Sequence, residues 1–166
     1  MLDADLLRRL KELRPEGDFS GFNFLDFMHA EGSPFEALVY SRLFWPRFVE
    51  IDGMIFMAGS FEDEDDLSRL SQALATYGGD RLKTEKSFNL FTISSLFGRR
   101  IGETTDEEDG CLLERLAQMW HSRLRQVFPE RCFVVEVLAD QQTGEGPGII
   151  FYQQAPDARV SGGTKR

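Results

Sequence analysis

The dipeptide Asp52-Gly53 lies between two short runs of β-forming residues, Phe48–Ile51 and Met54–Met57. Asp-Gly accepts the positive φ angles of a type I′ turn, so this arrangement predicts a tight β-hairpin. One continuous strand over 47–57 is the alternative, because its odd-numbered residues would then form one face, with Gly53 at a bulge. If the segment is a hairpin, its role is structural, and we expect function to lie on the surfaces that it supports.

Apolar spacing predicts the other elements. The periodicity is helical over 4–13, 33–44, 67–77 and 105–127, with a short helix or irregular apolar segment in 20–30 and a possible helical turn over 80–87. In 33–44 the apolar residues are spread around the helix, whereas 105–127 carries one continuous Leu/Trp stripe. Strands are expected over 88–93, 131–138 and 149–153.

The strand over 131–138 is wholly apolar on one face and mostly apolar on the other, which is typical of a central strand. The order of elements predicts an α+β fold. We expect a mainly antiparallel sheet of about four to five strands, with helices on one face and the long helix 105–127 packed across it. Residues 1–154 are expected to form a single domain, and 155–166 a flexible tail without periodicity.

The chain of 166 residues is 42% hydrophobic, which is enough for a sizeable core, and its formal net charge is −9. The charge is concentrated, because residues 61–110 hold 12 acidic and 6 basic side chains. Acidic surfaces repel phosphate backbones and anionic lipids, so nucleic-acid and membrane binding are disfavoured. A basic protein partner is favoured, and the structural alternative is that the charge only maintains solubility.

Cys111 and Cys132 form no CxxC motif and no zinc-like cluster. They are expected to be buried free thiols in a reducing compartment. The N-terminus lacks the basic and apolar regions of a signal peptide, and no apolar run reaches the length of a membrane span. The expected localisation is therefore cytoplasmic.

Five consecutive carboxylates precede the helix 67–77: Glu62, Asp63, Glu64, Asp65 and Asp66. They are candidates for binding a basic partner. The structural interpretation is that negative charge favours the helix N-terminus. A single metal ion is not expected, because consecutive helical residues point in different directions and no EF-hand spacing occurs.

Two further candidates for binding are the pair Arg99 and Arg100, which lies between glycines in a predicted loop, and Trp45, which precedes Pro46. Arginines so placed can hold a carboxylate by bidentate contact, or they balance the local acid.

No nucleophile elbow, zinc-protease motif, P-loop or dinucleotide fingerprint occurs. The remaining catalytic option is a group of carboxylates from Glu50, Asp52 and Glu136, with His29 as a possible addition, if these side chains converge. In a hairpin Asp52 belongs to the turn, which removes it from the strand face of Glu50. We therefore expect no catalytic residue, no metal and no cofactor.

The run from Tyr40 to Pro46, leading into Phe48, resembles in general character small bacterial α+β proteins, some of which act as partners or neutralisers of toxins. No motif assigns a family. We expect a non-catalytic protein-interaction protein of immunity-like or adaptor-like type that uses an acidic surface. The alternative is a small-molecule-binding protein or hydrolase, with a pocket between the sheet and the Phe-rich N-terminal segment lined by Phe22, Phe24 or Trp45.

Overall fold

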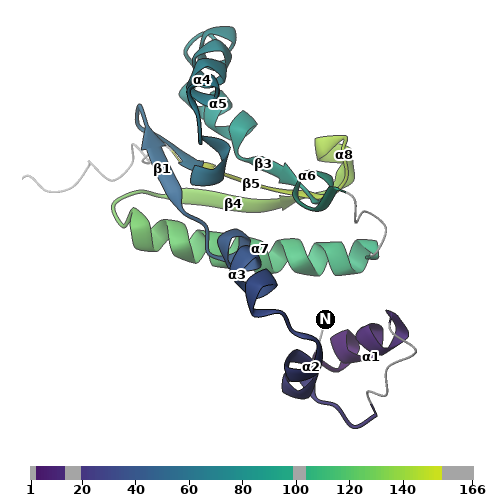
Figure 1. Cartoon of the computed structure of the whole chain (residues 1–166). Helices are drawn as coiled ribbons and strands as arrows, with labels where there is room; N and C mark the ends of the chain where they lie inside the picture. The colour runs from purple at the N-terminus through teal and green to yellow at the C-terminus, as the bar shows by residue number, and fades with distance from the viewer. Residues whose placement is uncertain (1–2, 14–19, 99–103, 155–166) are drawn as a thin grey trace, which may run out of the picture. The chain divides into compact units, whose positions relative to one another are not determined.

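A computed structural model of the chain describes residues 3–13, 20–98 and 104–154 (Figure 1). The chain divides into two compact units, Met1–Leu43 and Phe44–Arg166, each of which is described by itself. The expectation of a single domain over 1–154 remains a prediction. The predicted tail, 155–166, lies outside the described residues.

The structure is α+β, as predicted. In chain order its elements are α1 (Asp3–Leu13), α2 (Phe24–Glu31), α3 (Pro34–Phe44), β1 (Phe48–Ile51), β2 (Met54–Met57), the 3₁₀ turn η1 (Ala58–Ser60), α4 (Glu64–Thr76), α5 (Arg81–Phe88), β3 (Leu90–Thr92), α6 (Ile93–Phe97), α7 (Asp106–Val127), β4 (Phe133–Leu138), α8 (Asp140–Thr143) and β5 (Gly148–Gln153).

The predicted hairpin is confirmed. β1 pairs with β2 in antiparallel register, with Ile51 opposite Met54 next to the turn. Asp52 and Gly53 have φ angles of 50° and 79°, the two positive values that a type I′ turn requires. The continuous strand is therefore wrong.

The helix starts follow their local sequence signals. Ser33 Oγ accepts a hydrogen bond from the backbone N–H of Glu36 at 3.2 Å, and Pro34 occupies the first position of α3. Thr105 and Glu108 form a capping box at the start of α7. Such caps satisfy N–H groups that have no partner within the helix.

β3, β5 and β4 form a three-stranded antiparallel sheet with β5 in the middle. The expectation that residues 131–138 form the central strand is therefore wrong: β4 is an edge strand. The physical reason is that β5 is buried from Gly148 to Phe151 and has a strand on each side, whereas the exposed Glu136 and Val137 lie on β4.

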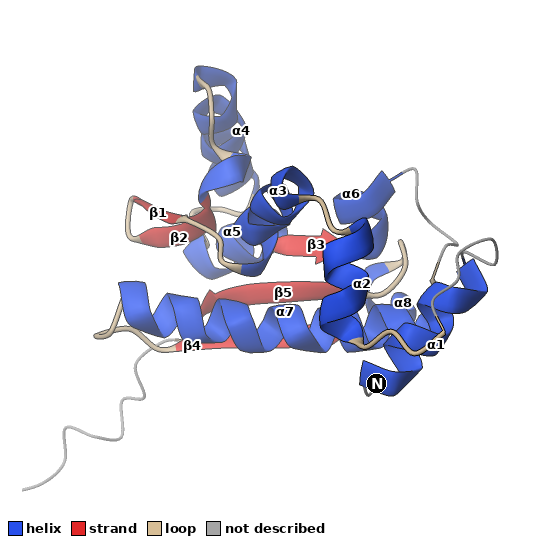
Figure 2. Cartoon of the chain, turned by 60° about the horizontal axis from the view of Figure 1, so that its bottom comes forward, coloured by secondary structure: helices blue, strands red, loops and turns tan. Residues whose placement is uncertain are grey.

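The long helix α7 runs along β4 and β5 (Figure 1, Figure 2). Its apolar stripe is buried at Leu113, Leu116, Trp120 and Leu124. Trp120 meets the ring of Phe151 edge-on, at 6.0 Å between ring centroids. The stripe is thus the core-facing side of the helix, as its spacing predicted.

The described strands do not form the single sheet of four or five strands that the sequence predicted. They form a two-stranded sheet and a three-stranded sheet. A single sheet would require β2 to pair with a strand of the other sheet. Helix α5 instead packs against both β2 and β5. Its buried side chains are polar, namely Thr84 and Glu85, so no apolar pattern could indicate this position.

Glu85 bonds to both sheets. One carboxylate oxygen accepts from the backbone N–H of Ile55 on β2 at 2.7 Å, and the other accepts from the backbone N–H of Gln153 on β5 at 2.8 Å. The side-chain amide of Gln153 donates to Glu85 as well, at 2.9 Å. The residue is 2% exposed, so these bonds replace the water that the carboxylate and the two strand ends would otherwise need.

Asn89 lies one helical turn further on and is fully buried. Its side-chain N–H donates to the carbonyl of Ile55 at 2.8 Å. Glu85 and Asn89 therefore satisfy both backbone groups of Ile55 as a neighbouring strand would. We call the contacts of these two side chains with Ile55 and Gln153 the α5 clamp.

We expect Glu85→Ala to lower the free energy of unfolding by about 2–5 kcal/mol, because the buried N–H of Ile55 and the partly buried N–H of Gln153 lose their acceptor. Glu85→Gln should cost less, since it keeps one of the two acceptor oxygens. Urea denaturation followed by circular dichroism measures the loss. The matched control is Glu114→Ala on the exposed side of α7, which should change stability by no more than about 0.5 kcal/mol. Equal effects of the two alanine variants would contradict the role of the clamp.

Candidate functional site

The acidic run divides into two groups. Asp63 is the N-cap of α4, and its side chain accepts from the backbone N–H of Asp66 at 3.0 Å. The Asp66 carboxylate accepts in return from the N–H groups of Glu62 and Asp63, at 2.8 and 3.2 Å. Two of the five predicted binding residues therefore cap the helix.

The other three residues, Glu62, Glu64 and Asp65, are exposed at the start of α4. Figure 1 shows α4 directed away from the three-stranded sheet. We call Glu62, Glu64 and Asp65 the acidic tip. Among the five carboxylates, these are the ones whose side chains are available to a partner.

The pKa of Asp66 is lowered from its ordinary value of 3.8, first by the hydrogen bond from the N–H of Glu62 and then by the bond to Arg69. The pKa of Asp80 is lowered mainly by the N–H of Lys83 at the start of α5. Helix capping is the largest cause of both pKa shifts, and neither shift indicates a catalytic group.

Trp45 is exposed and lies beside Arg123 of α7, whose guanidinium carbon is 5.6 Å from the ring centroid. Arg123 Nε also donates to the carbonyl of Pro46 at 3.4 Å. Trp45 thus contacts α7 through Arg123, and none of these contacts involves the acidic tip. Arg99 and Arg100 lie outside the described residues.

The carboxylates considered for catalysis have separate partners. Glu50 forms an ion pair with Arg131 at 2.6 Å, Asp52 is in the hairpin turn, and Glu136 accepts from the hydroxyl of Tyr152 at 3.2 Å. His29 belongs to α2 in the first unit. Within 3–13, 20–98 and 104–154, no three His, Cys, Asp or Glu side chains are placed to share a metal ion.

Glu85 is the carboxylate that the sequence analysis missed. Its two oxygens accept three N–H donors, and the side chain is buried. A substrate has no access to a carboxylate in this position, so its role is structural. The spacing of Glu85 and Asn89 on one helix face was the available signal, but many surface helices share it.

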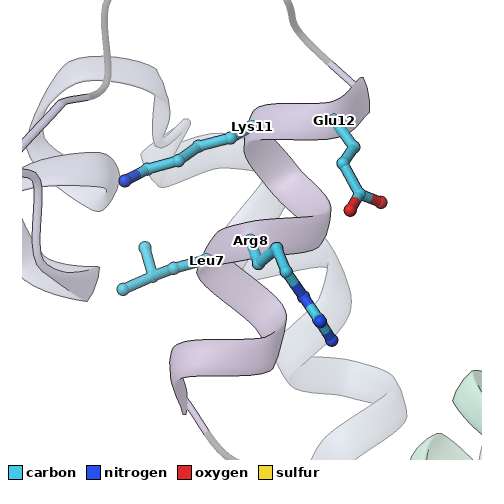
Figure 3. A pocket seen from close by; sticks show the side chains of 4 residues that line it. All are labelled: Leu7, Arg8, Lys11 and Glu12. Atoms are coloured by element: carbon cyan, nitrogen blue, oxygen red, sulfur yellow. The ribbon is translucent and has the colours of Figure 1, made fainter.

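A hollow on the first unit is lined by Leu7, Arg8, Lys11 and Glu12, and Figure 3 shows that all four belong to α1. Four residues of one helix do not enclose a ligand or bring polar groups together from several elements. The pocket predicted with Phe22, Phe24 or Trp45 combines residues of both units and stays a prediction.

The most exposed apolar residues lie in the first unit. None of the 11 residues of α3 is buried. Phe35, Leu38 and Val39 are 73%, 62% and 53% exposed, and their spacing of three and four residues places them on one side of the helix. We call these three residues the α3 face. Leu25 on α2 is 76% exposed as well.

The sequence signal for the α3 face was the spread of apolar residues around helix 33–44, which leaves some of them exposed whichever side of the helix packs. A helix that packs on its own domain concentrates its apolar residues on one side. Exposed apolar side chains that adjoin one another are typical of binding surfaces, whereas isolated ones are ordinary.

No family model, no curated protein and no solved structure matches this chain. None of the helices in the described part of the chain has the length and apolar composition needed to cross a membrane. Cys132 is an exposed free thiol and Cys111 is partly buried, so the expectation that both are buried is wrong.

We expect Asp66→Asn to destabilise the protein at neutral pH and to matter less in acid. A lowered folded pKa means that the carboxylate contributes stability above its ordinary value of 3.8, and that this contribution disappears as the pH falls through the folded value. Thermal unfolding at a series of pH values measures the gap from the wild type. Glu64→Gln, at the exposed acidic tip, is the control and should show almost no gap. A gap for Asp66→Asn that stays constant down to pH 2 would refute this assignment.

Proposed function

We propose that this chain is a non-catalytic protein-interaction protein and that the α3 face is its main binding surface. The observation that supports this proposal is the exposure of Phe35, Leu38 and Val39 on a helix that buries none of its residues. Helices bind apolar grooves through residues spaced three and four apart, which is the spacing of these three.

Burial gives the α3 face its binding energy. Each large apolar side chain that leaves water contributes about 1.5–3 kcal/mol, and Phe35 has the most area to bury. Three such side chains form a small central cluster of the kind that dominates many interfaces. The partner expected is therefore a protein with an apolar groove.

Charge defines the partner further. The chain has a net charge of −9, and the acidic tip adds three exposed carboxylates. Such a surface speeds the approach of a basic partner more than it strengthens the final complex. An adaptor-like or immunity-like role in the cytoplasm fits these properties.

The first test replaces the centre of the α3 face with the double variant Phe35→Ser and Leu38→Ser. Tagged wild type and variant are used to capture proteins from the native host, and the captured proteins are quantified by mass spectrometry. We expect at least one protein to be depleted by about tenfold or more with the variant, because the loss of two buried anchors costs several kcal/mol.

The matched control is Leu67→Ser, which removes an exposed apolar side chain from α4 in the second unit. It should leave the same captured protein unchanged. Equal capture by wild type and the double variant, with both folded by circular dichroism, would contradict the assignment of the α3 face.

The second test concerns the acidic tip. We expect the triple variant Glu62→Lys, Glu64→Lys and Asp65→Lys to lower the association rate with the captured protein by about tenfold at low salt, with a smaller effect at physiological salt. Asp63 and Asp66 stay unchanged because they cap α4. The control reverses three other exposed acids, Glu114, Glu130 and Glu145, for the same change in net charge. Equal effects of the two triple variants would show that only net charge matters.

A further inference from the structure

β4 is an edge strand of six apolar-rich residues, Phe-Val-Val-Glu-Val-Leu. β5 pairs with it on one side, and no described strand pairs with it on the other. An edge strand presents backbone N–H and C=O groups that can pair with another chain. The unpaired side of β4 is therefore a second surface, distinct from the α3 face, with backbone groups that can pair with another chain.

The register identifies which residues face outward. The N–H of Gln154 donates to the carbonyl of Cys132, so Cys132 and Gln154 form a hydrogen-bonded pair. Hydrogen-bonded and non-hydrogen-bonded pairs alternate along an antiparallel ladder. The backbone groups of Val134, Glu136 and Leu138 therefore point toward β5, whereas those of Phe133, Val135 and Val137 point outward.

β4 lacks the features that usually protect an edge. It contains no proline and no lysine, and its one charge is Glu136. The side chains of Phe133, Val135 and Val137 lie on the face that α7 covers, because the partners of Val135 and Val137 are Phe151 and Ile149 and the ring of Phe151 meets Trp120. Val137 is nevertheless 38% exposed.

We propose that the outer edge of β4 binds an extended peptide segment of a partner protein, which adds to the sheet as a fourth strand beside β4. The segment alternates apolar and basic residues. Its apolar side chains continue the α7-covered face next to Val135 and Val137, and its basic side chains lie on the opposite face near Glu136.

The local charges favour such a segment. Residues 130–140 carry three exposed acids, Glu130, Glu136 and Asp140, and the one basic residue among them, Arg131, is paired with Glu50. An acidic segment would meet like charge at Glu136 and at Glu130 and Asp140, which precede and follow β4 in the chain. A basic one gains attraction at Glu136, where a cross-strand pair of opposite charge is stabilising.

The size of the edge favours a peptide over a second copy of this chain. Six residues of strand span about 20 Å, and stable interfaces between folded proteins usually bury at least about 1,200 Å². Strand addition by a short peptide obtains its affinity from backbone hydrogen bonds and needs no larger surface. A second copy would also place two Glu136 side chains on the same face of the joined sheet.

The test uses amide hydrogen exchange by NMR, with a capped seven-residue peptide of alternating valine and lysine as the probe. In the free protein the amides of Phe133, Val135 and Val137 should exchange fast, and those of Val134, Glu136 and Leu138 slowly. The peptide should slow exchange at Phe133, Val135 and Val137 by about tenfold or more and leave the other three amides unchanged.

Two control peptides test the charge and the backbone of the probe. One replaces lysine by glutamate and the other carries N-methyl groups on alternate amides, and both should bind about tenfold more weakly.

A pair of variants tests the backbone contribution. Val137→Pro removes an outward N–H without removing a bond to β5, so the edge strand should tolerate it and binding should weaken by about tenfold. Val137→Ala loses the side chain but keeps the N–H, and its affinity should stay within about threefold of wild type. If Val137→Pro does not fold, the N-methylated peptide still decides the question.

Two results would overturn the proposal. One is unchanged exchange at Phe133, Val135 and Val137 with saturating peptide. The other is protection of these amides without peptide that rises with protein concentration, which identifies a second copy as the occupant. The serine variants of the α3 face should bind this peptide normally, so failure here and failure of the proposed function are distinguishable.

Discussion

The second unit depends on one buried carboxylate. A type I′ hairpin leaves the N–H and C=O of Ile55 pointing away from β1. β3 pairs only with residues 148–150 of β5, so it provides no acceptor for the N–H of Gln153. Strand ends of this kind need water or another strand. The α5 clamp supplies acceptors and a donor from one helix face instead, through Glu85 and Asn89. Two small sheets thereby share a helix that satisfies both, and a single sheet of four or five strands is not formed.

Local signals in the sequence predicted much of this fold. The Asp52-Gly53 turn, the Ser33 cap with Pro34, and the Leu/Trp stripe of α7 depend on residues that are close in the chain, and the structure has all three. The position of α5 depends on contacts across some 30 and 68 residues, made by polar side chains that no apolar pattern reveals. The edge position of β4 was missed for a related reason. A strand that is mostly apolar on both faces is typical of a sheet centre, but its position in the sheet depends on which other strands pair with it, and here β5 takes the middle.

The candidate sites follow the same division. A run of five acids is visible in the sequence, but only the geometry of the capping box separates Asp63 and Asp66 from the acidic tip. In the sequence, the apolar residues of α3 were visible only as a spread around the helix. The structure shows that Phe35, Leu38 and Val39 among them are exposed. Carboxylates that could have formed a catalytic group are instead divided among an ion pair, a turn and a tyrosine hydroxyl. The exposed α3 face and acidic tip are therefore the observations behind the proposed protein-interaction role.

Native-state hydrogen exchange at the amides of Ile55 and Gln153 tests the account of the α5 clamp most directly. Neither N–H donates to another strand, so without Glu85 both would face water or an unpaired edge. The clamp predicts that both amides exchange through global unfolding, at rates within about tenfold of core amides such as that of Phe151. Exchange at the rate of exposed backbone, while the Phe151 amide stays protected, would show that Glu85 does not join the two sheets.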